Sequence, residues 1–368
     1  MGWVQKELWR QSLKSIEKIS LIAVRLPLSS PYELSFITVK ELKTIYAKIT
    51  FSNGATSWGE CTPLYGYSDI DFITAWNEHI RLAELLMRKG GVVLNKDGFN
   101  HCALWTALHS NSCKKLDMDK AIPMVGLLQE TVNNGLLNTL NAQRDKGYSC
   151  FKVKVGVLGF EQDKKRLIQL QKFLFSHEKI RIDANQGLTP LEARNLAEIC
   201  DKSLVEVFEQ PLSIDSWNEM RKLSKESDID FMLDESIIGM DSLQKAVYPY
   251  PSCNWVKLKL MKQGSIELTH QMFKFARDHS LRVIFGNGVS GYLGNYQEAL
   301  LWHELQKYGE KTANNAIESN GFLKVEADPF SNLLTFDSGT VICNEWRDPD
   351  FSDCEIIKEW KVDKHLIN

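Results

Sequence analysis

The feature that most constrains this chain is a regular alternation of short apolar segments with amphipathic segments between residues 121 and 325. The amphipathic segments, such as 159–175 and 189–201, carry apolar residues at helical spacing. The candidate strands are IPMVGLL (122–128), CFKVKVG (150–156), IRIDANQG (180–187), VEVFEQPL (205–212), DFMLDES (230–236), NWVKLKL (254–260) and RVIFGNG (282–288). Strands that alternate with helices predict parallel βαβ units. Seven or more such units predict a closed (β/α)₈ barrel of the TIM type, which needs roughly 200 residues or more.

Two further regions flank the predicted barrel. Residues 18–65 are rich in Ile, Val, Thr and Tyr and contain a hairpin turn signal at 52–55, whereas the segment 71–90 has helical spacing and stops at two glycines. We therefore predict an α+β domain over residues 1–120 and a barrel domain over 121–325. The tail, 326–368, is predicted to form a few strands that return to the first domain.

Composition excludes several classes of protein. The net charge of −3 and the scattered charges give no electrostatic footprint for nucleic acid or an anionic membrane. No apolar run approaches the length of a membrane span, and the N-terminal stretch lacks the apolar centre of a signal peptide. The eight cysteines show no C-x-x-C spacing. This pattern favours reduced thiols in a cytoplasmic protein over a disulfide framework or a zinc site.

One charged residue recurs at the carboxyl end of five successive predicted strands. These residues are Lys154, Asp183, Glu209, Asp234 and Lys259, and they lie 25 to 29 residues apart. A single aspartate at a strand end is more often a helix cap or a turn residue. Five charges in phase are harder to explain in that way, because the carboxyl ends of barrel strands form one mouth and buried charges need partners.

The five residues form a chemically coherent set. Three carboxylates that converge would repel one another unless a cation joined them, and an all-oxygen site selects a hard ion, for which Mg²⁺ fits best. Asp183, Glu209 and Asp234 are therefore the predicted metal ligands. Lys154 and Lys259, from the second and sixth strands, would flank the metal. Each would face one side of the α-carbon of a carboxylate substrate bound there.

This arrangement suits removal of a proton α to a carboxylate through an enediolate, whose charge a divalent cation stabilises. A lysine base must be uncharged near neutral pH, and neighbouring cations lower its pKa. Lys152 shares a face with Lys154, so it is predicted to tune that lysine or to touch the substrate. Two other readings compete: a Schiff-base aldolase, which needs one lysine but not three phased carboxylates, and a binding protein on a degenerate barrel.

These motifs resemble the enolase superfamily, in particular its muconate-lactonizing-enzyme subgroup, over most of the chain. FKVKVG is similar to the K-x-K strand, with Lys154 as base, and DANQG, EQP and DES are similar to the three metal-ligand strands. KLMKQGS is similar to the motif of the sixth-strand lysine, here Lys259. The resemblance implies a modified TIM barrel, (β/α)₇β, with an α+β capping domain, Mg²⁺ and enolisation of a small carboxylate. It also implies a substrate-specificity loop at residues 27–36.

The chain departs from the family pattern at several positions. Ser265 stands where a second glycine is usual, and Lys257 adds a lysine on the face of Lys259, either facing substrate or satisfied within the barrel. No His–Asp dyad follows the seventh strand, which argues against the mandelate-racemase subgroup. The D-x-D pair that holds the amine in dipeptide epimerases corresponds to Glu318 and Asn320. One carboxylate in place of two weakens the case for dipeptide recognition.

Three further residues lie near the predicted mouth. Asn185 and Asn287 are candidates for substrate contact or for turns, and Glu235 is expected to face away from the site by strand alternation. The resulting prediction is a racemase, epimerase or cycloisomerase of an N-acyl amino acid, dipeptide or muconate-like acid, with an o-succinylbenzoate synthase-type lyase as the alternative. The resemblance implies homo-oligomers, but nothing in the sequence selects an oligomeric state.

Overall fold

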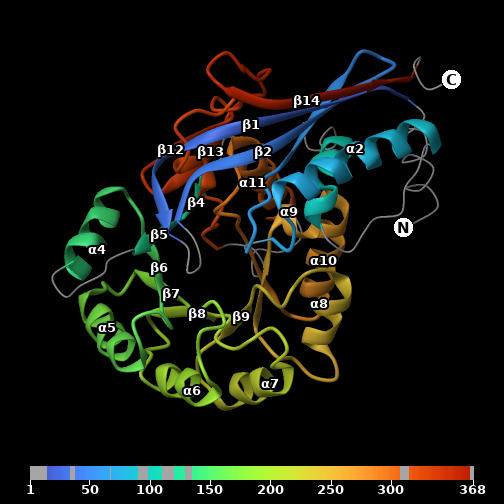
Figure 1. The fold of residues 1–368 in the computed structure, drawn as a ribbon. Coiled ribbons are helices and arrows are strands. Elements are labelled where there is room, and N and C mark those ends of the chain that lie inside the picture. The colour runs from blue at the N-terminus through green and yellow to red at the C-terminus, as the bar shows by residue number, and fades with distance from the viewer. Residues whose placement is uncertain are drawn as a thin grey trace.

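The computed structural model describes residues 15–33, 38–66, 68–89, 98–109, 120–128, 135–306 and 315–364. Figure 1 shows an antiparallel sheet lying across one end of a ring of parallel strands, which has its helices on the outside. The sequence therefore predicts the fold class correctly: a barrel-like parallel sheet is combined with an antiparallel capping sheet.

Seven parallel strands form the wall of the barrel, in the order β11-β10-β9-β8-β7-β6-β5. Their bounds are β5 Val125–Leu128, β6 Cys150–Lys154, β7 Lys179–Asp183, β8 Val205–Glu209, β9 Phe231–Leu233, β10 Trp255–Leu258 and β11 Arg282–Phe285. Residues alternate between the helix-covered outer face and the interior. In β6, for example, Phe151 and Val153 belong to the main hydrophobic core, whereas Lys152 is directed to the opposite face.

A short extended segment at residues 316–318 closes the barrel between its two edge strands. Glu318 N donates to Phe285 O of β11 (2.8 Å) on one side. On the other side Val125 N of β5 donates to Ile317 O (3.1 Å), and Ile317 N donates to Pro123 O (2.8 Å). This segment takes the place of the eighth strand and brings Glu318 to the same interior as the strand-end charges.

Helices alternate with the barrel strands as the sequence predicts. Their bounds are α4 Gly135–Asp145, α5 Phe160–Phe173, α6 Pro190–Glu198, α7 Trp217–Glu226, α8 Met240–Val247, α9 Leu260–Gln263, α10 Ile266–Asp278 and α11 Tyr292–Gln306. Local signals fix their starts. Thr189 and Glu192 form a capping box at the start of α6, and the Ser265 hydroxyl accepts from Leu268 N (3.0 Å) at the start of α10.

The capping sheet has the order β14-β1-β2-β3. Its strands are β1 Ile16–Glu33, β2 Thr38–Phe51, β3 Thr56–Cys61 and β14 Glu355–Asp363, and the helices α2 Phe72–Lys89 and α3 Cys102–His109 pack on it around a second hydrophobic core. The predicted turn at 52–55 is present, with Gly54 at φ 78°. The expected loop at 27–36 is in part wrong, because residues 27–33 belong to β1; residues 34–37 lie outside the described residues.

The strands of the tail, residues 326–364, pair partly with the capping sheet and partly with a strand beside the barrel. β14 pairs with β1 of the capping sheet, whereas the hairpin of β12 (Leu334–Asp337) and β13 (Thr340–Cys343) pairs with β4 (Ile122–Pro123) beside the barrel. The chain therefore crosses between the bodies more than once. The predicted domain boundaries stay a prediction.

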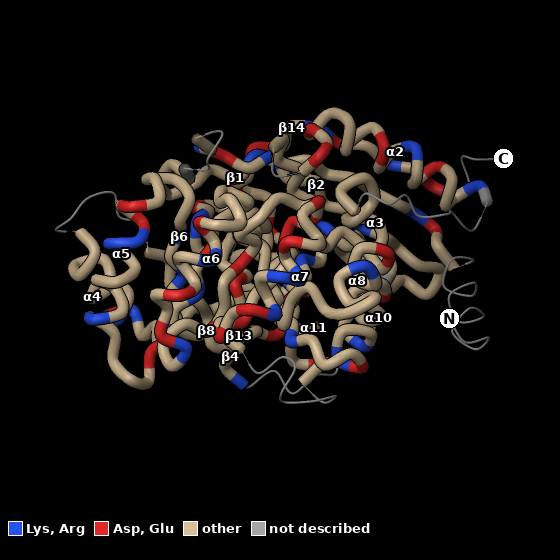
Figure 2. Tube along the Cα trace, turned by 90° about the horizontal axis from the view of Figure 1, so that it is seen from below, with Lys and Arg blue, Asp and Glu red and all other residues tan. Residues whose placement is uncertain are grey.

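Charges of both signs are interspersed over the described helices and strands (Figure 2), in keeping with the small net charge. The seven described cysteines are free thiols, and Cys113 lies outside the described residues. Within the described segments, no helix combines the length and the apolar character required to cross a bilayer.

Candidate active site

Strand register gathers the five phased charges at one end of the barrel. Lys154, Asp183 and Glu209 are the last residues of β6, β7 and β8, where Lys154 is paired with Asp183 and Asp183 with Glu209. Asp234 and Lys259 directly follow β9 and β10. In the strand order, the three carboxylates stand between the two lysines. This is the arrangement that the spacing predicts.

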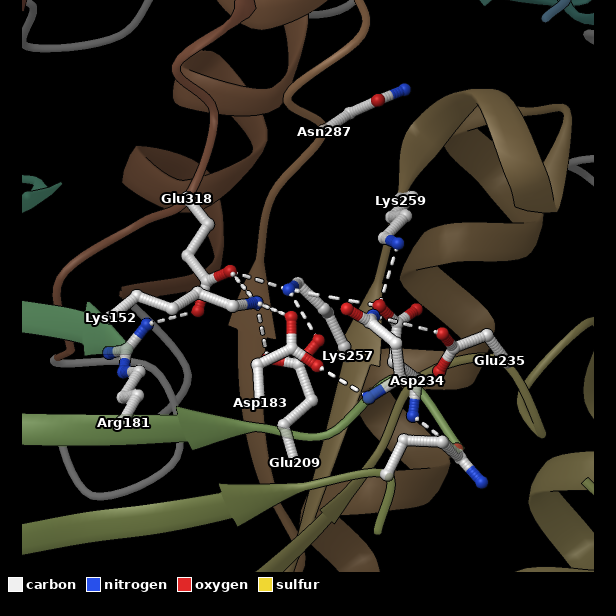
Figure 3. A network of polar contacts seen from close by, with 12 residues as sticks. Lys152, Arg181, Asp183, Glu209, Asp234, Glu235, Lys257, Lys259, Asn287 and Glu318 are labelled. Atoms are coloured by element: carbon white, nitrogen blue, oxygen red, sulfur yellow. Dashed lines mark hydrogen bonds and ion pairs between the residues drawn. The ribbon is translucent and has the colours of Figure 1, made fainter. Parts of the chain in front are cut away.

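Lys152 lies one layer deeper than the strand-end residues and binds three carboxylates (Figure 3). Its Nζ is 2.9 Å from Asp183 Oδ2, 2.6 Å from Glu209 Oε2 and 2.9 Å from Glu318 Oε2. Burial lowers the pKa of Lys152, but the attraction of these carboxylates outweighs it and raises the pKa well above its usual range. These contacts favour the ammonium form of Lys152.

Lys257 enters the same cluster from β10. Its Nζ donates to Glu209 Oε1 (2.9 Å) and to Glu318 Oε2 (2.5 Å), and it lies 3.8 Å from Asp234 Oδ2. The side chain is 4% exposed. Of the two alternatives left by the sequence, the structure favours a lysine that is satisfied within the barrel, although Lys257 also lines the pocket.

Lys259 and Lys262 approach Asp234 from the α9 side. Lys259 Nζ is 2.7 Å from Asp234 Oδ2, and Lys262 Nζ donates to the Asp234 backbone oxygen (2.5 Å). Burial raises the pKa of Asp234, but Lys259, Lys257 and Lys262 together lower it well below its usual range. Asp234 is therefore held as a carboxylate.

Glu209 is fully buried at the centre of the cluster. Burial raises its pKa and the negative charge of Asp183 raises it further, whereas Lys152 and Lys257 oppose the shift; the net direction is upward. Glu209 therefore depends on nearby positive charge to stay ionised.

Lys154 differs from its neighbours because its side chain is only partly buried and lines the pocket. Its backbone oxygen accepts from Arg166 Nη1 (2.7 Å), which fixes the end of β6. The described residues give the Lys154 ammonium no salt bridge. It is therefore better placed to meet a substrate than Lys152 is.

A pocket of about 990 Å³ covers the cluster. Barrel residues form its floor, and capping residues, among them Tyr32, Ser68, Phe99 and His101, form part of its wall. A volume at the upper end of the usual range for small-molecule sites suits a small organic acid.

Asn185 and Glu235 lie together at the pocket edge. Asn185 N donates to Asp183 Oδ1 (3.1 Å), and its Nδ2 donates to Glu235 Oε1 (3.2 Å). The expectation that Glu235 faces away is wrong, because β9 ends at Leu233 and strand alternation no longer applies two residues later. Asn185 thus orients Asp183 through its backbone and Glu235 through its side chain.

The other candidate substrate residues, Asn287, Asn320 and Glu318, differ in their surroundings. Asn287 is fully buried and its Oδ1 accepts from Val289 N (3.0 Å), which is the turn role left open by the sequence. Asn320 lines the pocket and accepts from Lys324 Nζ (3.2 Å). Glu318 lines the pocket as well, but its Oε1 accepts from Arg181 Nη1 (3.0 Å) while its Oε2 binds Lys152 and Lys257. Both oxygens of Glu318 are therefore engaged within the protein.

Three residues of the site were missed from the sequence, Arg181, Lys262 and Lys324, whereas Tyr32 lies in the segment 27–36 that was expected to form the specificity loop. Arg181 and Lys262 lie inside the motifs that identify the site, at positions from which alternation or one helical turn directs them inward. Lys324 and Tyr32 come from segments remote in sequence, and Lys324 Nζ lies 4.1 Å from the centre of the Tyr32 ring. No local signal reveals that pair.

The residues present fit a hard divalent cation in chemical type. Asp183, Glu209 and Asp234 offer only oxygen, and the buried Asp234 Oδ1 accepts no hydrogen bond from the described residues, with Lys262 Nζ 3.5 Å away. In the described segments, however, these carboxylates do not form a ready three-ligand cluster. Several oxygens of these three carboxylates form ion pairs with lysine ammonium groups instead.

Fold and site together define a capped (β/α) barrel with acidic and basic residues at the carboxyl ends of its strands. The family model "Enolase C-terminal domain-like" matches residues 136–342, more than half of the chain. The chain therefore belongs to this family of the enolase superfamily, as the motifs predict.

Known relatives support the same assignment. The chain is 24% identical over 353 residues to L-Ala-D/L-Glu epimerase of Bacillus subtilis, covering 89% of this chain and 93% of the relative. It is 22% identical over 316 residues to muconate cycloisomerase 1 of Acinetobacter baylyi, covering 77% and 83%. A solved dipeptide epimerase of Cytophaga hutchinsonii, complexed with Mg and D-Ala-L-Val, has a TM-score of 0.79 at 18% identity and covers 95% of this chain and 100% of that one. At this identity the structural likeness establishes the fold.

Proposed function

We propose that the protein is an isomerase that removes and returns a proton α to the carboxylate of a small organic acid. One observation carries this proposal: Lys154 and Lys259 stand on opposite sides of one pocket, with Asp183, Glu209 and Asp234 on the strands between them. Two lysines facing one substrate carbon allow a proton to leave from one face and return to the other. The epimerases and the cycloisomerase among its relatives agree with this reaction class.

The chain's own residues have distinct proposed roles. Lys154 is the base, because its side chain is partly exposed at the pocket and forms no salt bridge with a described residue, and Lys259 exchanges the proton on the opposite face. Lys152 stays charged and orients the carboxylates or the substrate. Mg²⁺ would be held by Asp183, Glu209 and Asp234, where it would stabilise the second negative charge that develops as the α-proton leaves.

The surroundings of Glu318 favour a substrate without a free ammonium group. Lys152, Lys257 and Arg181 neutralise Glu318, and the adjacent Asn320 accepts from Lys324 Nζ. A free dipeptide amine would therefore meet no available carboxylate at these two positions. We propose an N-acyl amino acid as the preferred substrate class, ahead of dipeptides and muconate-like acids.

Mass spectrometry in D₂O with Mg²⁺ tests the reaction. The substrates are N-acyl amino acids, dipeptides with the same side chains, hydroxy acids and unsaturated diacids. We expect one deuterium at the α-carbon of an N-acyl amino acid, faster than for the matched dipeptide and abolished by EDTA. Loss of water without exchange would instead identify the lyase alternative. Absence of both exchange and product across the panel would contradict the proposal.

A further inference from the structure

Lys257 occupies a position that the family motifs do not explain. The K-x-K strand accounts for Lys152, and the sixth-strand motif accounts for Lys259, but Lys257 is an addition of this chain. Figure 3 shows its ammonium among the carboxylates of Glu209, Asp234 and Glu318. It contacts Glu209 and Glu318 directly and lies 3.8 Å from Asp234. Two of these three residues are proposed metal ligands.

The cluster is electrically balanced without a metal ion. Four carboxylates meet three ammonium groups and one guanidinium: Asp183, Glu209, Asp234 and Glu318 against Lys152, Lys257, Lys259 and Arg181. Glu206, whose Oε2 lies 2.6 Å from Arg181 Nε, and Lys262, whose Nζ lies 3.5 Å from Asp234 Oδ1, add one further charge of each sign. A divalent cation would therefore enter a buried site that has no excess negative charge, where repulsion between like charges is weakly screened.

We propose that Lys257 is an internal competitor of the divalent metal, and that its ammonium sets the metal affinity below the value that the three carboxylates would otherwise give. This inference rests on the proposed function, because it takes Asp183, Glu209 and Asp234 as the metal ligands. Lys257 Nζ lies 2.9 Å from Glu209 Oε1, so the metal ion and the lysine would compete for the same buried carboxylate. Metal binding would either weaken the contact between Lys257 and Glu209 or be opposed by repulsion between the metal ion and the Lys257 ammonium.

Isothermal titration calorimetry with Mg²⁺ and with Mn²⁺ tests the competition directly. Lys257→Met removes the charge and nearly preserves the length of the side chain, whereas Lys257→Gln also retains a hydrogen-bond donor toward Glu209 and Glu318. We expect both variants to bind the metals about 10- to 100-fold more tightly than the wild type, the range over which groups around metal ligands change affinity. Lys172→Met, on the exposed face of α5, is the matched control and should leave the affinity unchanged.

Thermal unfolding supplies a second readout that does not depend on activity. Without metal, Lys257→Met should melt below the wild type, because Glu209 and Glu318 lose a buried partner, and Mg²⁺ should raise its melting temperature more than that of the wild type. If Lys257→Met does not fold, Lys257→Gln carries the test.

The outcomes separate the two proposals. Clear metal binding with equal or weaker affinity in both Lys257 variants would overturn the competition and leave the proposed function intact. Absence of Mg²⁺ and Mn²⁺ binding in the wild type and in both variants would overturn the metal site of the proposed function, and the competition with it.

Discussion

At the scale of single residues, the lysines that face the interior of the barrel have different surroundings. Lys152 and Lys257 are buried and enclosed by carboxylates in the barrel interior, whereas Lys154 is partly exposed at the pocket. Within β6, burial and the number of carboxylate partners therefore distinguish Lys152, the proposed charge-compensating lysine, from Lys154, the proposed base. The K-x-K pattern predicts both lysines of β6 but cannot distinguish these roles without the contacts of Glu209 and Glu318.

Replacement of the two proposed proton-transfer lysines is expected to have a face-specific effect. Lys154→Ala and Lys259→Ala should each reduce α-proton exchange by about 10²- to 10⁴-fold, the usual contribution of a general acid or base. Each variant should retain more exchange with one enantiomer than with the other, because one lysine still faces one side of the α-carbon. Proton NMR in D₂O with each enantiomer measures this. The exposed Lys172→Ala variant should match the wild type, and full activity of both site variants would refute the assignment.

Lys324 should give the protein a measurable pH dependence of stability. Burial, together with the positive charges of Lys154 and Lys152, lowers its pKa to about 7. Since the unfolded chain binds this proton up to a pKa of about 10.4, the unfolded state holds more protons between pH 7 and that value. Stability of the wild type should therefore rise with pH through this window.

Lys324→Met removes that dependence. Relative to the wild type, its free energy of unfolding should be larger, meaning a more stable fold, by about 1 to 3 kcal/mol more at pH 6 than at pH 9, after allowance for the partial exposure of the residue. The variant loses the hydrogen bonds to Gly288 O and Asn320 Oδ1 at both pH values, so the difference between the two pH values isolates the charge. Urea unfolding at each pH provides the measurement, and an equal change at both would disprove the shift.

At the scale of elements, the turn that carries Lys259 shows how a departure from the family pattern is accommodated. Gly264 has φ 78°, and a Cβ there would lie 2.5 Å from His101 Nε2 of the cap, so glycine is required. Ser265 has an extended backbone (φ −156°), which any residue adopts, and its hydroxyl caps α10. Serine can therefore replace the second glycine of the family motif without strain.

Two substitutions of Ser265 distinguish capping from simple tolerance. Ser265→Ala should cost about 1 kcal/mol of unfolding free energy, because the Leu268 N–H loses its acceptor, whereas Ser265→Gly should cost only a few tenths. Denaturant titration of both variants measures the difference. Equal losses in the two variants would show that the hydroxyl does not stabilise the start of α10.

The elements of the barrel could be predicted because each has a local period, whereas the ends of β9 and β1 could not. β9 ends at Leu233, which brings Glu235 into the pocket against the alternation rule, and β1 extends through residues assigned to a loop. The closing segment at 316–318 is too short to show a period of its own. It is defined by hydrogen bonds to β11 and to the β4–β5 segment, which are far from it in sequence.

At the scale of the whole molecule, Glu60 joins the cap to the barrel. It lies in β3, yet its carboxylate accepts from Gly291 N (2.6 Å) and Gly294 N (2.7 Å) at the start of the barrel helix α11. The tail joins at the same place, because Tyr292 N donates to Asp328 Oδ2 (3.0 Å). Cap, tail and barrel therefore meet at one helix N-terminus, where burial and the negative charge of Asp328 raise the pKa of Glu60 to about 8 and the hydrogen bonds from Gly294 and Gly291 oppose the shift.

Substitution of Glu60 should loosen this junction in two steps. Glu60→Ala leaves two buried N–H groups without an acceptor and should cost about 2 to 5 kcal/mol, whereas Glu60→Gln keeps one acceptor oxygen and should cost less. Because capping residues form part of the pocket wall, Glu60→Ala should also raise KM more than it lowers kcat. Denaturant unfolding and steady-state kinetics measure both effects, with the exposed Glu359→Ala of β14 as control. A stable Glu60→Ala enzyme with unchanged KM would mean that the cap is held to the barrel elsewhere.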